Sequence, residues 1–172
     1  LGTILTAAMN KHPENVGFYF MERTFLFKEI LEYSQKFATF LQKNGLEKGD
    51  IVAICLPNCP QYLYSAYGTY IAGGTVSGCS PLLSPNELAY QLEDCGAKFV
   101  ITMDIVYEKV FSQFLDNLPK LKVIVPTNIS EFMGLPGIKV LLGKLIGKIP
   151  KGKMKPWPNK TVVPFLDAVD TD

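Results

Sequence analysis

The chain has 172 residues, of which 48% are hydrophobic and 19% are charged, and its formal net charge at pH 7 is +1. This composition is typical of a globular protein and excludes a disordered one, and the length is sufficient for one domain with a hydrophobic core. The near-zero net charge excludes a general attraction to nucleic acid, so no nucleic-acid partner is expected.

The cysteines and the single histidine form no recognisable metal-binding motif. Cys55, Cys59, Cys79 and Cys95 include no CxxC pair, and His12 lies far from them in sequence, which argues against a structural zinc site. The apolar neighbours of the cysteines predict buried, reduced thiols. His12 is compatible with a catalytic base and with a solvated residue at a helix end, and its charged and proline neighbours favour the second interpretation.

Residues 1–48 are predicted to form an entry helix, a hairpin and a second helix. Ile4, Leu5, Ala8 and Met9 fall on one face of a helix over residues 1–10, and residues 16–21 and 24–27 have the pattern of two paired strands. The clearest amphipathic helix covers residues 28–44, where apolar side chains recur at helical spacing. Gly45 supplies the left-handed position that commonly ends a helix.

Residues 49–125 have the alternating pattern of βαβ units. An apolar run at residues 51–56 predicts a strand buried on both faces, and a helix over residues 61–72 follows, with Asn58 as its expected N-cap. The pair Gly73-Gly74 is compatible with a phosphate cradle or a tight turn, and its place after a helix favours the turn. Ser84 and Glu87 have capping-box spacing at the start of another helix.

The same alternation continues to residue 125. A strand is predicted at residues 99–102, a helix at 107–118 and a strand at 123–125. Short turns between alternating strands and helices indicate right-handed crossovers. The predicted fold class is therefore α/β, with a mostly parallel sheet flanked by helices.

Residues 126–172 differ in character. Between Phe132 and Leu166 there are seven lysines and no acidic residue, and apolar side chains from Ile138 to Ile149 recur at helical spacing. This basic amphipathic insertion is compatible with packing on the domain body, which we favour, or with peripheral contact to a membrane through residues 132–155. Residues 161–166 are predicted to be an exit strand, and residues 167–172 to end without packing.

No secretion signal and no apolar run of about 18 residues occur, so a cytoplasmic location is expected, with contact to the inner membrane face as the further alternative.

Three motifs in the central region resemble the acyl-adenylate-forming (AMP-binding) enzymes, above all fatty acyl-CoA and aryl-CoA ligases. They are GDIVAICLPNCPQY from Gly49, YIAGG from Tyr70 and SPLLSPNELAYQLEDCGAK from Ser80. The resemblance covers about residues 10–125, and this region is similar to the N-terminal part of a long-chain fatty acyl-CoA ligase. Leu26 and Gly78 depart from the pattern, because the family usually has a threonine or serine cap at the first position and a proline at the second.

The resemblance implies a parent enzyme that uses ATP and Mg²⁺ to convert a carboxylic acid to an acyl-adenylate and then transfers the acyl group to coenzyme A. In this family, a Ser/Thr/Gly-rich loop ending in PKG binds the ATP phosphates, an aspartate holds the ribose, and a lysine of a C-terminal domain promotes adenylation. None of these elements has a counterpart in this sequence. We therefore assign no catalytic, cofactor-binding or metal-binding residue, and the acidic stretch from Asp167 to Asp172 is given no such role.

Residues 1–172 are expected to be one N-terminal subdomain, comprising 1–48, the βαβ core 49–125 and the insertion and exit strand 126–172. Its expected partners are the C-terminal portion of the same enzyme and a fatty acid substrate of the parent, and the subdomain alone is expected to be inactive. Three alternatives stay open: an aryl-CoA ligase fragment, a stand-alone α/β scaffold and a membrane-surface module.

Overall fold

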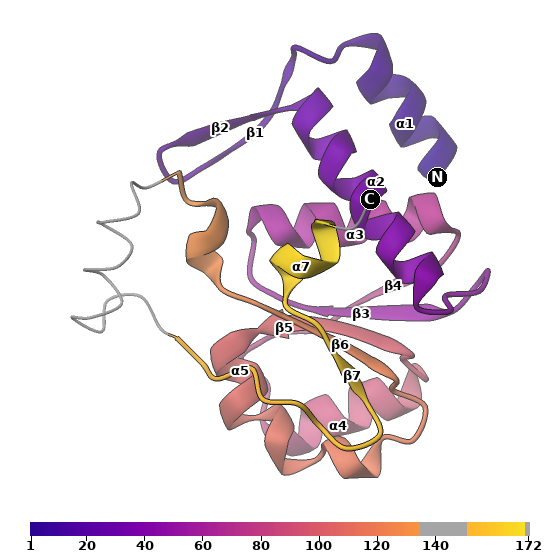
Figure 1. Cartoon of the computed structure of the whole chain (residues 1–172), viewed down its shortest axis with the longest axis vertical. Helices are drawn as coiled ribbons and strands as arrows, with labels where there is room; N and C mark the ends of the chain where they lie inside the picture. The colour runs from indigo at the N-terminus through magenta and orange to yellow at the C-terminus, as the bar shows by residue number, and fades with distance from the viewer. Residues whose placement is uncertain (135–150, 171–172) are drawn as a thin grey trace.

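A five-stranded parallel sheet with helices on both faces forms the centre of the protein, in a computed structural model that describes residues 1–134 and 151–170 (Figure 1). The strand order is β4-β3-β5-β6-β7. These strands are β3 (Ile51–Cys55), β4 (Thr75–Gly78), β5 (Phe99–Met103), β6 (Val123–Thr127) and β7 (Thr161–Val162). The α/β class and the parallel sheet predicted from the sequence are confirmed.

Helices cover the two faces of the sheet, and two antiparallel strands lie outside it. The helices are α1 (Gly2–Lys11), α2 (Phe27–Lys43), α3 (Pro60–Ala72), α4 (Pro85–Asp94), α5 (Asp104–Lys109) and α7 (Phe165–Val169). The strands β1 (Val16–Phe20) and β2 (Arg23–Leu26) form the predicted hairpin. Helices α2, α3 and α7 lie on one side of the sheet, and α4 and α5 lie on the other (Figure 1).

The central strand β3 is buried on both faces, as its uninterrupted apolar sequence predicts. Val52 and Ile54 belong to the hydrophobic cluster that includes α2 and α3. Ala53 and Cys55 point to the other face, into the cluster that includes α4 and α5. Two hydrophobic cores therefore share one sheet, and the parallel pairing of its strands places all their carboxyl ends at the same edge.

Helix α1 forms where predicted, but it packs through only part of the predicted face. Met9 is buried, whereas Ile4 is 70% exposed. The contact with α3 is made instead at Gly2, where a Cβ atom would lie 2.5 Å from the carbonyl oxygen of Tyr70. The absence of a side chain at Gly2 thus sets how closely α1 approaches α3.

Helix α2 confirms its predicted cap. Gly45 has a φ angle of 82°, and the amides of Gly45 and Leu46 donate to the carbonyls of Gln42 and Leu41 at 3.0 and 2.9 Å. This pair of bonds is the Schellman motif. At the other end, Leu26 occupies the N-cap position and makes no side-chain cap hydrogen bond.

The N-cap of α3 differs from the prediction. Cys59, in an extended conformation, is the N-cap, and no side chain caps this helix. Pro60 has no amide hydrogen and occupies the first turn, so one fewer donor requires a cap. Gly73, with a φ angle of 90°, ends α3, which confirms the predicted tight turn.

Helix α4 has the predicted capping box, in which Ser84 and Glu87 cap each other. The predicted helix over 107–118 is wrong in its extent, because α5 ends at Lys109 and two 3₁₀ turns follow, η1 (Phe111–Gln113) and η2 (Leu115–Asn117). Side chains three residues apart align in a 3₁₀ turn. The rings of Phe111 and Phe114 accordingly lie 5.2 Å apart in the core.

The C-terminal part also differs from the prediction. The strand β7 ends at Val162, because Pro164 cannot continue the ladder of backbone hydrogen bonds and α7 begins after it. Ala168 and Val169 are buried, so the described part of residues 167–172, which are predicted to end without packing, belongs to the core, as does Phe165 before it. Most of the predicted basic helix lies outside the described residues. Within the described residues, no helix is long and apolar enough to cross a membrane.

Candidate functional site

The loops that follow the parallel strands meet at one edge of the sheet. The strand β3 leads through Asn58 into α3, β5 leads into Asp104 at the start of α5, and β6 leads into Asn128 and the 3₁₀ turn η3 (Ile129–Phe132). In open α/β sheets, ligands bind outside the carboxyl ends of the strands. A ligand is therefore expected to bind at this edge.

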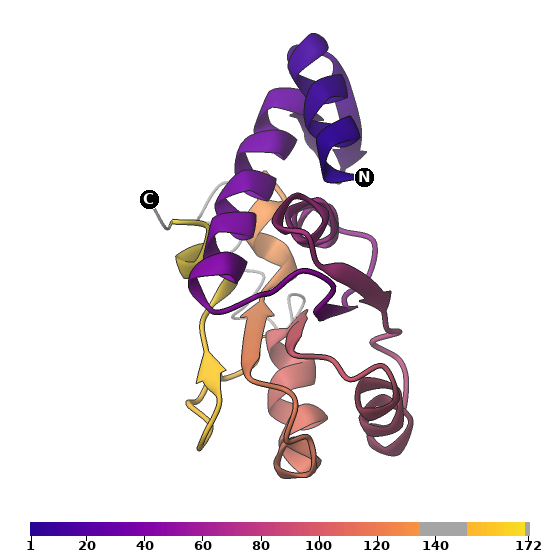
Figure 2. The ribbon, with the colours of Figure 1, turned by 90° about the vertical axis from the view of Figure 1, so that its right-hand side faces the viewer.

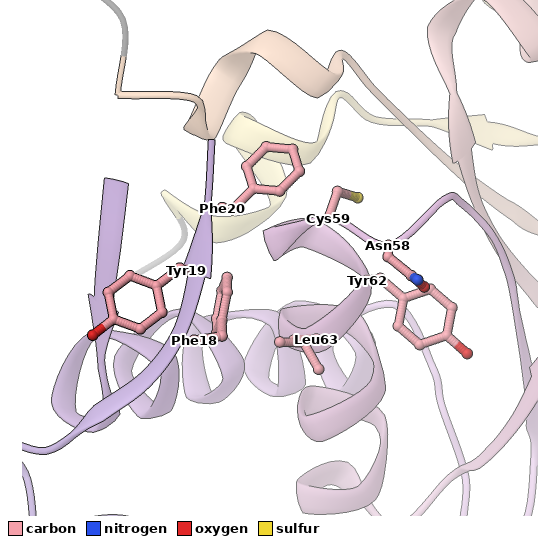
Figure 3. Close-up of a pocket in the computed structure, with 7 residues that line it drawn as sticks. All are labelled: Phe18, Tyr19, Phe20, Asn58, Cys59, Tyr62 and Leu63. Carbon is pink, nitrogen blue, oxygen red and sulfur yellow. The ribbon is translucent and has the colours of Figure 1, made fainter. Parts of the chain in front are cut away.

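A cavity of about 320 Å³ lies between the hairpin and the start of α3 (Figure 3). Phe18 and Phe20 extend from β1 toward α3, whereas Tyr19 extends away and is 74% exposed. The lining residues are mainly aromatic and aliphatic and comprise Phe18, Tyr19, Phe20, Asn58, Cys59, Tyr62 and Leu63. A cavity of this size and composition suits an apolar group with one polar substituent.

The thiols of this region are not activated for nucleophilic attack. Burial raises the pKa of Cys59 to about 11 and the pKa of Cys55 to about 12. Since the thiolate is the nucleophile, both side chains remain protonated at neutral pH. All four cysteines are free, as predicted, although Cys95 is half-buried. The cavity can bind a group but offers no reactive thiol.

A buried polar network lies beside this cavity and joins α3 to the end of β6. The Gln61 side-chain amide donates to Thr127 Oγ1 at 3.1 Å and to the Asn128 carbonyl at 3.0 Å. The Thr127 hydroxyl donates to Glu131 Oε2 at 2.6 Å. Burial raises the pKa of the Glu131 carboxyl group, and the hydrogen bonds that it accepts partly offset this effect.

Asn128 extends the network to α5. Its Nδ2 donates to Asp104 Oδ2 at 2.8 Å, and its Oδ1 accepts from the Ser130 amide at 3.1 Å and the Ser130 hydroxyl at 2.6 Å. The other oxygen of Asp104 accepts from the Ile105 amide at 2.8 Å. Asp104, Asn128 and Ser130 are each at most 5% exposed. The network thus fixes the ends of β5 and β6 relative to each other.

Both carboxylates of the network are engaged by hydrogen bonds within the protein, so they do not fit a magnesium site. Within residues 1–134 and 151–170, no three potential metal ligands lie together. His12 is exposed where α1 ends, away from the network. We predicted no site residue from the sequence, and the network was missed. Asn128 and Glu131 have the spacing of a capping box directly after a strand, which is the signal that could have revealed them.

Comparison with known proteins places this geometry in a family. A model of the AMP-binding enzyme family matches residues 5–144. The chain is 38% identical over 136 residues to a long-chain-fatty-acid–CoA ligase of Bacillus subtilis. The aligned region covers 79% of this chain and 24% of the relative. The chain therefore spans about a quarter of that relative's length.

Solved structures show the same fold. The structure of an acetoacetyl-CoA synthetase from Streptomyces lividans superposes with a TM-score of 0.75 at 15% identity. The match covers 99% of this chain and 25% of the synthetase chain. The structure of an anthranilate CoA ligase, AuaEII, in complex with anthranoyl-AMP superposes with a TM-score of 0.68 at 19% identity. The match covers 94% of this chain and 30% of the AuaEII chain. Since the family model covers most of the chain, the protein belongs to the AMP-binding enzyme family.

Proposed function

We propose that this chain is the N-terminal subdomain of an ATP-dependent fatty acid–CoA ligase, which adenylates a carboxylic acid and then forms a thioester with coenzyme A. The observation that carries the proposal is the 38% identity to a long-chain-fatty-acid–CoA ligase over 79% of the chain. The resemblance of the central motifs to the ligases supports it. The division into residues 1–48, 49–125 and 126–172 belongs to the same proposal.

The role that we propose for the described residues is to support the active site of the parent ligase. The parent enzyme would use ATP, Mg²⁺ and coenzyme A, and its chemistry requires cations around the phosphates. Asp104 and Glu131 hold loops through internal hydrogen bonds, and the nearby cavity is apolar. We infer that the groups that bind the phosphates belong to the remaining length of the ligase, and that the chain alone is inactive.

Pyrophosphate release tests this proposal. The 172-residue chain and the full product of its gene are assayed with ATP, Mg²⁺ and either a long-chain fatty acid or an aromatic acid. We expect release by the full product with the fatty acid and none by the chain alone. Release with the aromatic acid alone would favour the aryl-CoA ligase alternative. Release by the isolated chain would contradict its supporting role.

Peripheral membrane contact through residues 132–155 is the alternative to packing of this segment on the domain body, and the lysines and apolar residues of that sequence support it. This alternative predicts that the full chain binds vesicles that contain anionic lipid and loses this binding when Lys144 and Lys148 are replaced by glutamate. Sedimentation with vesicles at low and high salt measures it, since salt screens such contacts. Equal binding by the variant would contradict membrane contact at this segment.

A further inference from the structure

Three lysines lie in register beside one another, each directly before one of three adjacent parallel strands. They stand at the amino ends of these strands, and we call this edge of the sheet, opposite the candidate site, the amino-end edge. Lys98, Lys122 and Lys160 immediately precede β5, β6 and β7. The Lys122 amide donates to the Lys98 carbonyl at 2.9 Å, and the Thr161 amide donates to the Lys122 carbonyl at 2.9 Å. Figure 2 shows β6 and β7 side by side and pointing the same way. Neighbouring strands are about 4.8 Å apart, and like charges directly opposite each other are destabilising.

The two outer lysines of this row have partners within the protein. Lys98 Nζ lies 2.7 Å from Asp50 Oδ2 and 2.6 Å from the Gly45 carbonyl oxygen. Lys160 Nζ donates to the carbonyls of Leu118 and Leu121 at 2.7 and 2.9 Å. Burial lowers the pKa of Lys160, and the charge of Lys122 lowers it further. Partners within the protein thus offset the charge repulsion at Lys98 and Lys160 but not at Lys122, which lies between them.

The central lysine and its neighbour Lys120 are exposed cations beside two hollows. Within the described residues, neither Lys120 nor Lys122 forms an ion pair or a side-chain hydrogen bond. A hollow of about 400 Å³ is lined by Asp50, Gly96, Lys98, Pro119, Lys120 and Lys122. A second, of about 270 Å³, shares Pro119 and Lys122 with it and extends to Lys160.

The acidic groups in these hollows are already engaged. Asp50 pairs with Lys98, and Asp116 accepts a hydrogen bond from the Trp157 indole at 2.9 Å. The linings together contain four lysines and these two aspartates, so positive charge is in excess. Two unpaired ammonium groups at a concave surface match a phosphate dianion, which offers several acceptor oxygens.

We propose that this amino-end edge binds the phosphate group of a soluble phosphorylated ligand, with Lys120 and Lys122 as its direct partners. A soluble ligand fits better than a lipid headgroup because neither lining contains an exposed large apolar side chain that could enter a bilayer. This inference does not depend on the proposed ligase activity, since the site lies away from the carboxyl ends of the strands.

Titration of the full chain with inorganic pyrophosphate, followed by backbone amide chemical shifts, tests the proposal. We expect saturable shifts around Gly96, Lys120 and Lys122. In the double variant Lys120→Gln, Lys122→Gln, the affinity should fall about tenfold, because two ionic contacts that solvent weakens are lost. The matched control Lys11→Gln, Lys151→Gln removes two exposed lysines elsewhere and should change the affinity less than about twofold.

A second measurement uses the unmodified protein and so does not depend on the folding of a variant. Pyrophosphate should slow chemical acetylation of Lys120 and Lys122, but not of Lys11 and Lys151, as measured by mass spectrometry. Absence of saturable shifts, equal loss of affinity in the control variant, or uniform protection of all four lysines would overturn the site. Binding to anionic vesicles that depends on Lys120 and Lys122, without competition by pyrophosphate, would overturn the soluble ligand.

Discussion

Replacement of Phe37 by alanine is expected to lower the free energy of unfolding by about 3–5 kcal/mol. The Phe37 ring is fully buried on α2 and lies 5.9 Å from the ring of Phe40 and 5.4 Å from that of Phe165 on α7. It also faces Gly68 of α3, where a Cβ atom would lie 3.0 Å from Phe37 Cδ1 and 2.8 Å from the Ser34 carbonyl. Neighbours this closely packed cannot collapse fully into the space that alanine leaves.

Urea unfolding monitored by circular dichroism measures this loss of stability, provided that the m-value, the slope of the free energy of unfolding against urea concentration, is the same in both proteins. Tyr90→Ala is the matched control, because Tyr90 is an aromatic residue on α4 that is 71% exposed. Its replacement should change stability by no more than about 0.5 kcal/mol. If the two variants lost similar amounts, the packing of α2 against α3 and α7 would not be as described.

Replacement of Asn128 by alanine is expected to cost about 2–4 kcal/mol of stability, since buried groups on both sides lose their partner. Asp104 Oδ2 loses a donor at 2.8 Å, and the Ser130 amide and hydroxyl lose their shared acceptor. Asp104 is 1% exposed, so water cannot readily replace the lost donor. The loops after β5 and β6 should also exchange their amide hydrogens faster.

Asn58→Ala provides the matched control for this prediction. Asn58 follows β3 at the same edge of the sheet, but its side chain is exposed. We expect its replacement to change stability by less than about 0.5 kcal/mol and to leave hydrogen exchange near Asn128 unchanged. Equal stability of the two variants, or unaltered exchange in the Asn128 variant, would show that the polar network does not hold these loops.

Local sequence signals were sufficient for most of the regular structure. The helical spacing of apolar residues located α2, the uninterrupted apolar run located β3, and the Ser84 and Glu87 pair located the start of α4. Each of these signals lies within one element and reflects burial or capping of that element alone. The resemblance to the ligases was confirmed by the family match.

Long-range contacts explain what the sequence did not predict. Gln61 and Thr127 are bonded across 66 positions, and no local pattern indicates such a pair. The level that Lys98, Lys122 and Lys160 share follows from strand order and register, which composition does not determine. The 3₁₀ turns η1 and η2 replace the predicted helix after α5, and nothing in the spacing of the apolar residues distinguishes the two conformations, since side chains three residues apart share one face in both.

The mass of the gene product in its native source tests the central claim most directly. Tryptic peptides from this chain should occur in a polypeptide much heavier than the 19.1 kDa of residues 1–172, as expected for one subdomain of a ligase. The same fraction should form acyl-CoA from a long-chain fatty acid, ATP and coenzyme A. A native product of about 19 kDa with no such activity would contradict the claim and favour a stand-alone α/β module.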